Sequence, residues 1–297
     1  MQGETESEVT MQSTATPENA QAHNRWLGID FSGDCRMWRA TRRKTNVWVA
    51  ELSGEPDQPV LDSVRTVHEL PGEEAPFYKL LAFLKRKHFA AAAIDAPFSI
   101  PLAYLPWGSQ GKLLKLVAGM KRPENCPFPT ANDFVRAVLA GRALQEKKPL
   151  RETERYWQKQ NVNVRLTLWA GARGGAAMTS ACLTLLYGAG CSIWPWARTM
   201  ASGLLVEAFP AAQLCQWEMS HDRYNGNEYE ASSTRRKLVD SLSARIHLGP
   251  FRGRLEASAD ALDAVVCGFA ANAVTSRKLP NWLPDAPDPE GRIAVHK

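Results

Sequence analysis

The sequence predicts an α/β protein with a mixed five-stranded sheet and helices packed on its faces. Near the start of the chain, three short runs rich in apolar and aromatic residues are joined by tight polar links, which is typical of neighbouring antiparallel strands. Farther along, two almost continuous apolar runs are separated by helical segments, as expected for strands that are covered on both faces. Together these patterns indicate an antiparallel meander continued by parallel strands.

The expected elements follow in chain order. The first three strands form the meander, a helix leads to a fourth strand, and the fifth strand comes about a hundred residues later. Five strands are expected over residues 26–30, 35–41, 47–52, 89–95 and 203–209, with the first helix over 76–88. The fourth strand, "FAAAAID", has the uniform apolar character of a strand in the middle of a sheet.

The segment between the fourth and fifth strands, residues 96–203, is too long for a simple crossover. It contains Pro-rich turns and two expected helices, over 132–144 and 176–190, so we expect an insertion that forms a cap or a substrate-facing wall. Two further helices are expected over 233–246 and 258–276. The sequence thus predicts a single domain over 24–276 and a Pro-rich C-terminal segment over 277–297.

Composition is that of an ordinary globular protein, at 297 residues with 44% hydrophobic and 23% charged residues. Residues 1–23 contain four Glu and no Lys or Arg, which predicts a disordered acidic tail. This tail has neither the apolar run of a secretory signal nor the arginines of a mitochondrial presequence, so a cytoplasmic location without membrane contact is expected. Without the tail, the formal charge rises from +5 to +9, which favours polyanionic partners.

Acidic residues stand at or near the ends of three predicted strands: Asp30, Asp95 and Glu207. The carboxyl ends of parallel strands are where α/β proteins gather functional groups. Asp260 and Asp263 are three residues apart and therefore share one face of the last predicted helix. If that helix packs at the same edge of the sheet, the carboxylates repel unless cations hold them, and hard oxygen ligands select Mg²⁺ or Mn²⁺.

Each of these acids also has a structural explanation. A strand-end Asp commonly caps a helix or shapes a turn by accepting backbone N–H groups, and Asp95, which precedes Ala-Pro, suits that role. Asp260 can simply face the positive end of the helix dipole. The joint pattern of strand order and acid placement is what favours a shared site.

Basic and polar residues offer candidate substrate contacts. Ser32 lies in the Phe-Ser-Gly turn after Asp30, Arg151 belongs to a basic cluster with Lys147 and Lys148, and Arg235 and Arg236 belong to another. Such clusters contact phosphates or form a solvated face. The glycine-rich stretch "GARGGAA", residues 171–177, precedes a predicted helix and either cradles a phosphate or forms a flexible loop.

Four motifs in order carry a family resemblance: "GIDFSG", "AIDAPFSIP", "VEAFPAA" and "SADALDAVVCGFAA". From about residue 25 to 276, the chain resembles the domain-of-unknown-function family 429 (DUF429), whose members are predicted nucleases of the RNase H-like fold. The "DALDA" helix also resembles the D-x-x-D-A helix of RuvC-type Holliday-junction resolvases. The long insertion before Glu207 departs from those resolvases.

The resemblance implies a metal-dependent nuclease that acts on DNA or RNA. Asp30 would be the central metal ligand, Glu207 the second and Asp263 the third, with Asp260 as a neighbour and Asp95 in the same catalytic group. The chemistry that fits these residues is two-metal hydrolysis of a phosphodiester, so two Mg²⁺ or Mn²⁺ ions are expected. This scheme requires no nucleophilic side chain.

Two other functions remain open at this point. "DFSG" imitates the phosphate-binding turn of actin-like ATPases and sugar kinases, although no second such turn followed by a second meander is found. An RNase H-like scaffold that binds nucleic acid or protein without cutting it is the third possibility. Nothing in the sequence selects between DNA and RNA or sets the oligomeric state.

Overall fold

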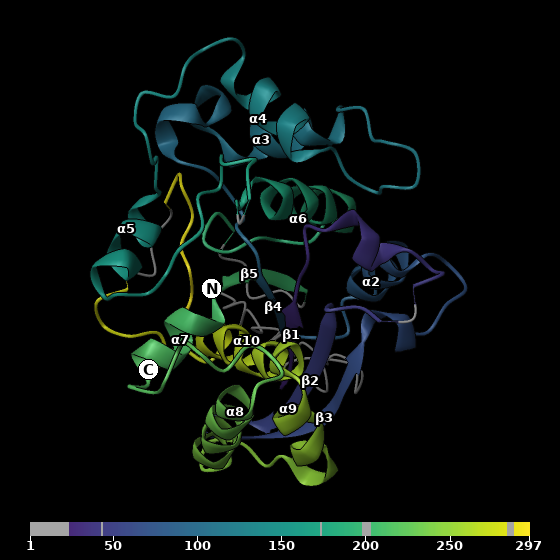
Figure 1. The fold of residues 1–297 in the computed structure, drawn as a ribbon, viewed down its shortest axis with the longest axis vertical. Coiled ribbons are helices and arrows are strands. Elements are labelled where there is room, and N and C mark those ends of the chain that lie inside the picture. Colours follow the sequence, from purple (N-terminus) through teal and green to yellow (C-terminus); the bar gives the residue numbers. More distant parts are fainter. Residues whose placement is uncertain (1–23, 43, 173, 198–202, 284–287) are drawn as a thin grey trace, which may run out of the picture.

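The computed structural model describes residues 24–42, 44–172, 174–197, 203–283 and 288–297. The tail predicted to be disordered, residues 1–23, lies outside them. The core is a five-stranded sheet with the order β3–β2–β1–β4–β5 (Figure 1). Its strands are β1 (Arg25–Asp30), β2 (Trp48–Glu55), β3 (Gln58–Thr66), β4 (Ala91–Asp95) and β5 (Leu204–Ala208).

The strand directions match the predicted mixed sheet. β2 is antiparallel to both β1 and β3, whereas β4 is parallel to β1 and to β5. The meander and the two parallel strands are therefore confirmed, and so is the α/β class. Because β1, β4 and β5 all run in one direction, their carboxyl ends lie at the same edge of the sheet.

The prediction of a strand over residues 35–41 is wrong. Cys35–Trp38 forms a 3₁₀ helix, η1, in which the Asp34 carboxylate caps the start by accepting the backbone N–H of Arg36 at 2.9 Å. Trp38 is buried, and its indole N–H donates to the carbonyl of Ser32 at 2.8 Å. The third strand of the meander is instead β3, which follows β2 across the short turn at residues 56–57.

Helices cover both faces of the sheet. They are α2 (Pro76–Lys85), α3 (Gln110–Ala118), α4 (Ala131–Leu139), α5 (Glu152–Lys159), α6 (Ala176–Ala189), α7 (Pro210–Gln216), α8 (Tyr229–Leu242), α9 (Arg252–Ala257) and α10 (Ala259–Thr275). Further 3₁₀ turns are η2 (Val67–Glu69), η3 (Leu102–Tyr104), η4 (Pro106–Gly108) and η5 (Gly249–Phe251). No helix in the described ranges has the length and apolarity needed to cross a membrane.

Alternation along the strands assigns side chains to two separate cores. Ile29 and Ile94 pack with α6 in one cluster, while Trp26 and Ala93 pack with α10 in the other. Figure 1 shows α6 and α10 on either side of the strands. Because successive strand residues point to opposite faces, the position of an acid within its strand decides which helix it meets.

Gly28 sets how closely α10 approaches β1. A Cβ atom at this position would lie 1.9 Å from the carbonyl oxygen of Ala264 and 2.3 Å from the backbone N of Gly268. The absence of a side chain in the middle of "WLGID" therefore lets the backbone of α10 rest directly on the strand, as a buried strand glycine permits. Asp30 follows two residues later on the same face, so this contact brings α10 to the end of β1.

The expected insertion between β4 and β5 is present and contains η3, η4 and α3 to α6. Residues 288–297, which belong to the predicted Pro-rich segment, return to the sheet. The backbone N–H of Ala294 donates to the carbonyl of Glu207 at 2.9 Å, and Ile293 and Val295 are buried beside Trp157 and Ala212. This part of the C-terminal segment thus covers the outer side of β5 and is part of the packed domain.

Candidate active site

Asp30 and Asp95 occupy equivalent positions at the ends of neighbouring strands. They are direct partners in the parallel pairing of β1 and β4. Partners in adjacent strands point to the same face, and such strands lie about 4.8 Å apart. Both residues belong to the face covered by α10, because Asp30 is two positions after Gly28. The two strand-end aspartates are therefore side by side.

The helix α10 adds two more aspartates. Its first turn is capped by Ser258, whose hydroxyl accepts the N–H of Ala261 at 3.2 Å, and it carries Asp260 and Asp263 on one side. The Tyr224 hydroxyl donates to the Asp263 carboxylate at 2.8 Å. The close contact at Gly28 explains why this end of α10 reaches the sheet edge. The structure thus brings Asp30, Asp95, Asp260 and Asp263, hereafter the aspartate cluster, to one place.

Burial, and to a smaller extent mutual repulsion, raises the pKa values of the clustered carboxyl groups. Burial raises the pKa of Asp30 well above its usual value, and Asp263, Asp95 and Asp260 raise it further. Burial and Asp95 likewise raise the pKa of Asp263, against the hydrogen bond from Tyr224, which lowers it. The pKa of Asp95 is about 7, raised by burial and by Glu207 and lowered by Arg165.

Two arginines lie near the cluster without pairing with it: Arg165 lowers the pKa of Asp95, and Arg235 lowers that of Asp260. Within the described ranges, no Lys, Arg or His forms an ion pair with any of the four carboxylates. Asp30 is only 8% exposed and Asp263 only 9%. Buried carboxylates in this situation either hold protons or need an external cation. As the side chains stand, no group of three or more His, Cys, Asp or Glu among the described residues is positioned to hold a metal ion.

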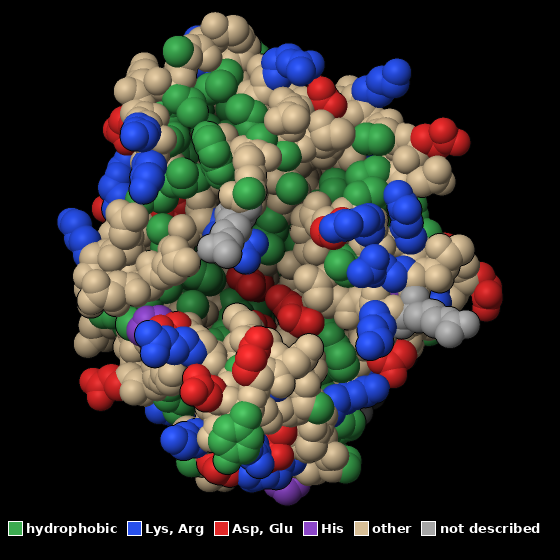
Figure 2. Space-filling model, in the orientation of Figure 1, with side chains coloured by type: hydrophobic (Ala, Val, Ile, Leu, Met, Phe, Trp, Pro, Cys, Tyr) green, Lys and Arg blue, Asp and Glu red, His purple; other side chains and the backbone are tan. Residues whose placement is uncertain are grey.

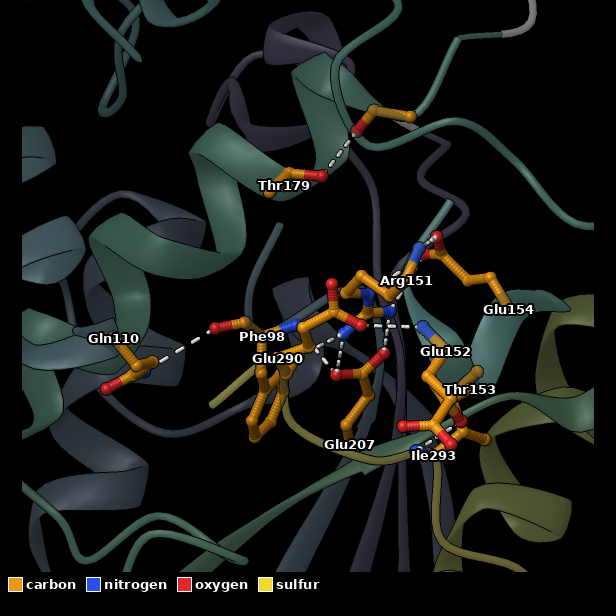
Figure 3. Close-up of polar contacts among 11 residues, drawn as sticks. Phe98, Gln110, Arg151, Glu152, Thr153, Glu154, Thr179, Glu207, Glu290 and Ile293 are labelled. Atoms are coloured by element: carbon orange, nitrogen blue, oxygen red, sulfur yellow. Dashed lines mark hydrogen bonds and ion pairs between the residues drawn. The ribbon is translucent and has the colours of Figure 1, made fainter. Parts of the chain in front are cut away.

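Glu207 has a different environment from the four aspartates. It pairs with Ile94 in the sheet, one position before the Asp95 partner Ala208, so its side chain leaves the opposite face of the sheet. There the guanidinium of Arg151 donates to the two carboxylate oxygens at 2.5 and 2.8 Å, and the N–H of Phe98 donates at 3.0 Å (Figure 3). Glu207 still lies near enough to Asp95 to raise its pKa.

Arg151 connects Glu207 to a second acid at the start of α5. Its guanidinium also donates to Glu154 at 2.9 and 3.0 Å, as Figure 3 shows. Burial disfavours the charged guanidinium, yet Glu154 and Glu207 raise the pKa of Arg151 above its usual value. We call Arg151, Glu154 and Glu207 the arginine triad. All three are at most 3% exposed, so the triad is a buried, internally paired charge group.

The other predicted substrate contacts are placed as follows. Ser32 is buried at the sheet edge, and its hydroxyl accepts the N–H of Asp34 at 3.2 Å. Arg235 is buried as well and donates to the carbonyls of Tyr224 and Gly226, so it holds the loop that carries Tyr224. Arg236 is exposed on α8, where its guanidinium lies 6.0 Å from the centre of the Tyr229 ring.

A cleft of about 1220 Å³ opens over the aspartate cluster. Figure 2 shows this hollow near the middle of the face, with acidic side chains on its floor. The members of the aspartate cluster, Glu207, Ser32, Arg151 and Arg235 all line it. Its walls also contain residues that the sequence did not single out as site residues: Asn46, Asn163, Arg165, Arg223 and Tyr224. They come from loops. No local sequence pattern shows that these loops approach the strand ends.

Comparison with family models gives one match, to the family described as "Protein of unknown function (DUF429)", over residues 28–288. The chain belongs to the DUF429 family. The matched region begins inside β1 and includes the aspartate cluster and the arginine triad, so both groups lie within the family domain. No curated protein and no solved structure matches the chain.

Proposed function

We propose that this DUF429 protein is a metal-dependent nuclease whose aspartate cluster binds divalent cations. The observation that carries the proposal is the cluster itself, in which carboxylates from β1, β4 and α10 repel one another and form no ion pair with a cationic side chain of the described residues. An all-carboxylate donor set suits Mg²⁺ or Mn²⁺. Ion binding would have to draw the carboxylates together, since no three of the described side chains already stand in a coordinating arrangement.

The residues would divide the work as follows. Asp30 and Asp263 would hold the ions, with Asp95 and Asp260 beside them, and Tyr224 would orient Asp263 through its hydrogen bond. Bound ions would supply an activated water and offset charge on the leaving oxygen. Glu207, which the family resemblance suggested as a ligand, is assigned here a positioning role, because Arg151 and the Phe98 N–H already use its carboxylate.

Two further features support a nucleic-acid substrate. The chain without its acidic tail carries a formal charge of +9, although the floor of its main cleft is acidic. A basic body attracts a polyanion, and an acidic floor repels it unless cations are present. The sheet, a three-stranded meander continued by two parallel strands, supports the RNase H-like interpretation of the family.

The alternatives have less support. An actin-like ATPase or sugar kinase needs a second, duplicated domain, whereas the described residues contain one five-stranded sheet. A scaffold that binds without cutting would have no need for four mutually repelling acids, two of them buried. Both remain outcomes that the cleavage experiment can reveal.

The proposal is tested with labelled single- and double-stranded DNA and RNA in Mg²⁺ or Mn²⁺. Wild-type protein should cut at least one of these, and Asp30→Asn and Asp263→Asn should each slow cleavage by at least about 100-fold, or about 2.7 kcal/mol of transition-state stabilisation. Asp62→Asn, which changes an exposed aspartate on β3, should retain full activity. Equal cleavage by wild type and Asp30→Asn would indicate a contaminant, and no cleavage of any substrate would contradict the proposal.

A further inference from the structure

Part of the loop between α5 and α6 forms one wall of the cleft. This wall carries a polar side chain, that of Arg165, which has no hydrogen bond or ion pair to another described residue. Its lining residues are Asn161, Asn163, Val164, Arg165, Gly171 and Gly174. Gly33, in the turn after β1, packs so closely on the first turn of α6 that a Cβ atom there would lie 2.3 Å from the Met178 N. The end of this loop is thereby fixed against the turn that carries Asp30.

Arg165 differs from the other described arginines that line the cleft. Arg36 pairs with Asp34, Arg223 with Asp222, Arg151 lies in the arginine triad, and Arg235 donates to backbone carbonyls. Arg165 is exposed and has neither an ion pair nor a hydrogen bond to any described residue. It is nevertheless close enough to Asp95 to lower the pKa of that carboxyl. Its guanidinium is therefore available to an anion that reaches the aspartate cluster.

Trp169 lies four residues farther along the same loop, next to Gly171, which lines the cleft. Its indole packs against Gly171, where a Cβ atom would lie 2.8 Å from three ring atoms, and Gly171 itself lines the cleft. The residue is 51% exposed, although its backbone is held by hydrogen bonds with Leu166 and Ala176 at 3.1 and 3.2 Å. A large aromatic face is thus held on fixed backbone and left open to solvent.

A guanidinium and an aromatic face on one loop match the two repeating parts of a nucleic-acid strand, the phosphate and the base. Sequence-tolerant binding of single strands uses this combination, because every base has a face that can stack. A paired base in a duplex is already stacked on its neighbours and cannot offer that face. The cleft volume of about 1220 Å³ is only slightly above the range of about 300–1,000 Å³ of small-molecule pockets, which suits a short stretch of strand.

We infer that the substrate is single-stranded or locally unpaired nucleic acid, with a phosphate on Arg165 and a base stacked on Trp169. This inference rests on the proposed nuclease function and names its substrate class. Arg165 positions the strand so that a neighbouring phosphate reaches Asp30 and Asp263 on the floor of the cleft. Gly171 then serves to hold Trp169 next to the cleft, in place of the phosphate cradle considered from the sequence.

The test separates binding from cutting. Binding is measured by fluorescence anisotropy with a labelled oligonucleotide of about 12 nucleotides, as a single strand and in a duplex, on protein that carries Asp30→Asn. Arg165→Met and Trp169→Ala are added singly, with Arg155→Met and Trp107→Ala as matched controls, since Arg155 is exposed on α5 and Trp107 is 81% exposed, and neither lines the cleft.

The single strand should bind at least about 10-fold more tightly than the duplex, and Arg165→Met and Trp169→Ala should each remove most of that preference while the controls keep it. Arg165→Met should also make the plot of log binding constant against log salt concentration less steep, by the amount that corresponds to about one phosphate contact. Equal binding of both forms, or a preference that survives both changes, would overturn the inference. The binding measurement does not depend on cleavage, so it tests this inference even if the wild-type protein cuts no substrate. Failure of the nuclease proposal would be seen separately, in the cleavage assay.

Discussion

Two buried groups of acids lie at the same edge of the sheet and differ in how their charge is balanced. The arginine triad, on the face of α6, holds Glu154 and Glu207 with the guanidinium of Arg151 between them. The aspartate cluster, on the face of α10, has four carboxylates and no ion pair within the described ranges. This difference underlies our proposal that the arginine triad is structural and that the aspartate cluster binds a ligand.

Both carboxylates of the triad accept hydrogen bonds from the guanidinium of Arg151. Glu207 accepts from Arg151 and Phe98, and Glu290 accepts the N–H groups of Leu102 and Glu152, both at 2.6 Å. These contacts join β5, the turn after β4, α5 and the C-terminal segment (Figure 3). The aspartate cluster joins β1, β4 and α10 without such compensation. Burial of uncompensated charge lowers stability, so a protein that retains it gains something other than stability.

The largest expected effect is on the triad. Arg151→Met should lower the free energy of unfolding by about 3–5 kcal/mol, because it leaves two buried carboxylates without their cation. Asp30→Asn, in contrast, should leave metal-free stability unchanged or raise it, since it removes one of several repelling charges. Urea unfolding of both variants without metal measures the difference. If Asp30→Asn lowered the free energy of unfolding as much as Arg151→Met does, the aspartate cluster would be a structural group like the arginine triad.

Gly28→Ala should damage the cluster through the packing of α10. The added methyl would lie 1.9 Å from the Ala264 oxygen, so the helix must move away from β1. We expect a loss of about 1–3 kcal/mol or more in the free energy of unfolding and a weaker affinity for Mn²⁺. Gly253→Ala, on α9 with open space around the added methyl, is the matched control and should change neither quantity. Unchanged Mn²⁺ affinity in a folded Gly28→Ala protein would argue against a site that depends on α10.

The aspartate cluster should make the stability of the protein depend on pH. Folded-state pKa values of Asp30, Asp95 and Asp263 lie above their usual values, so the folded state binds these protons more tightly than the unfolded state. Without metal, the contribution of these groups to the free energy of unfolding is therefore greatest at low pH. It falls as the pH rises through about 7, the pKa of Asp95. Between pH 5 and 8 the free energy of unfolding should fall by more than about 1 kcal/mol, and by less in Asp30→Asn. A stability that rises over this interval in wild type, and equally in the variant, would contradict the account.

A smaller effect is expected at Tyr224. Tyr224→Phe removes the hydrogen bond to Asp263 and should cost about 0.5–1.5 kcal/mol of stability. The same hydrogen bond lowers the pKa of Asp263, so its loss should raise that pKa and shift Mn²⁺ binding to higher pH. Calorimetric Mn²⁺ titrations at several pH values measure the shift. A pH dependence identical to that of wild type would show that Tyr224 has no part in the cluster.

Much of the aspartate cluster could be predicted from the sequence. Asp30 and Asp95 close two apolar strands with the same "ID" ending, and such endings meet when the strands are parallel neighbours. The three-residue spacing of Asp260 and Asp263 places them on one helix face whatever the fold. Gly28, a glycine inside a buried strand, also carried a local signal of close backbone approach.

The rest depended on long-range contacts. Glu207 was expected to join the cluster, but one residue of register decides the face on which a strand residue lies, and the register of β5 is set by pairing. Its partner Arg151 is 56 residues away, in a basic cluster that was expected to contact phosphates or to form a solvated face. The strand expected over 35–41 failed for a related reason, since Asp34 capped a 3₁₀ helix there and β3 took its place.

The central claim, that the aspartate cluster binds divalent cations and the arginine triad does not, is tested most directly by the rise in melting temperature on adding Mn²⁺ or Mg²⁺ at pH 8. At an ion concentration about 100 times Kd, wild type should melt about 5 °C or more higher than without the ion. Asp30→Asn should lose most of this rise, and Glu207→Gln, once circular dichroism shows that it is folded, should keep it. An equal rise in wild type and Asp30→Asn, or loss of the rise in folded Glu207→Gln, would contradict the claim.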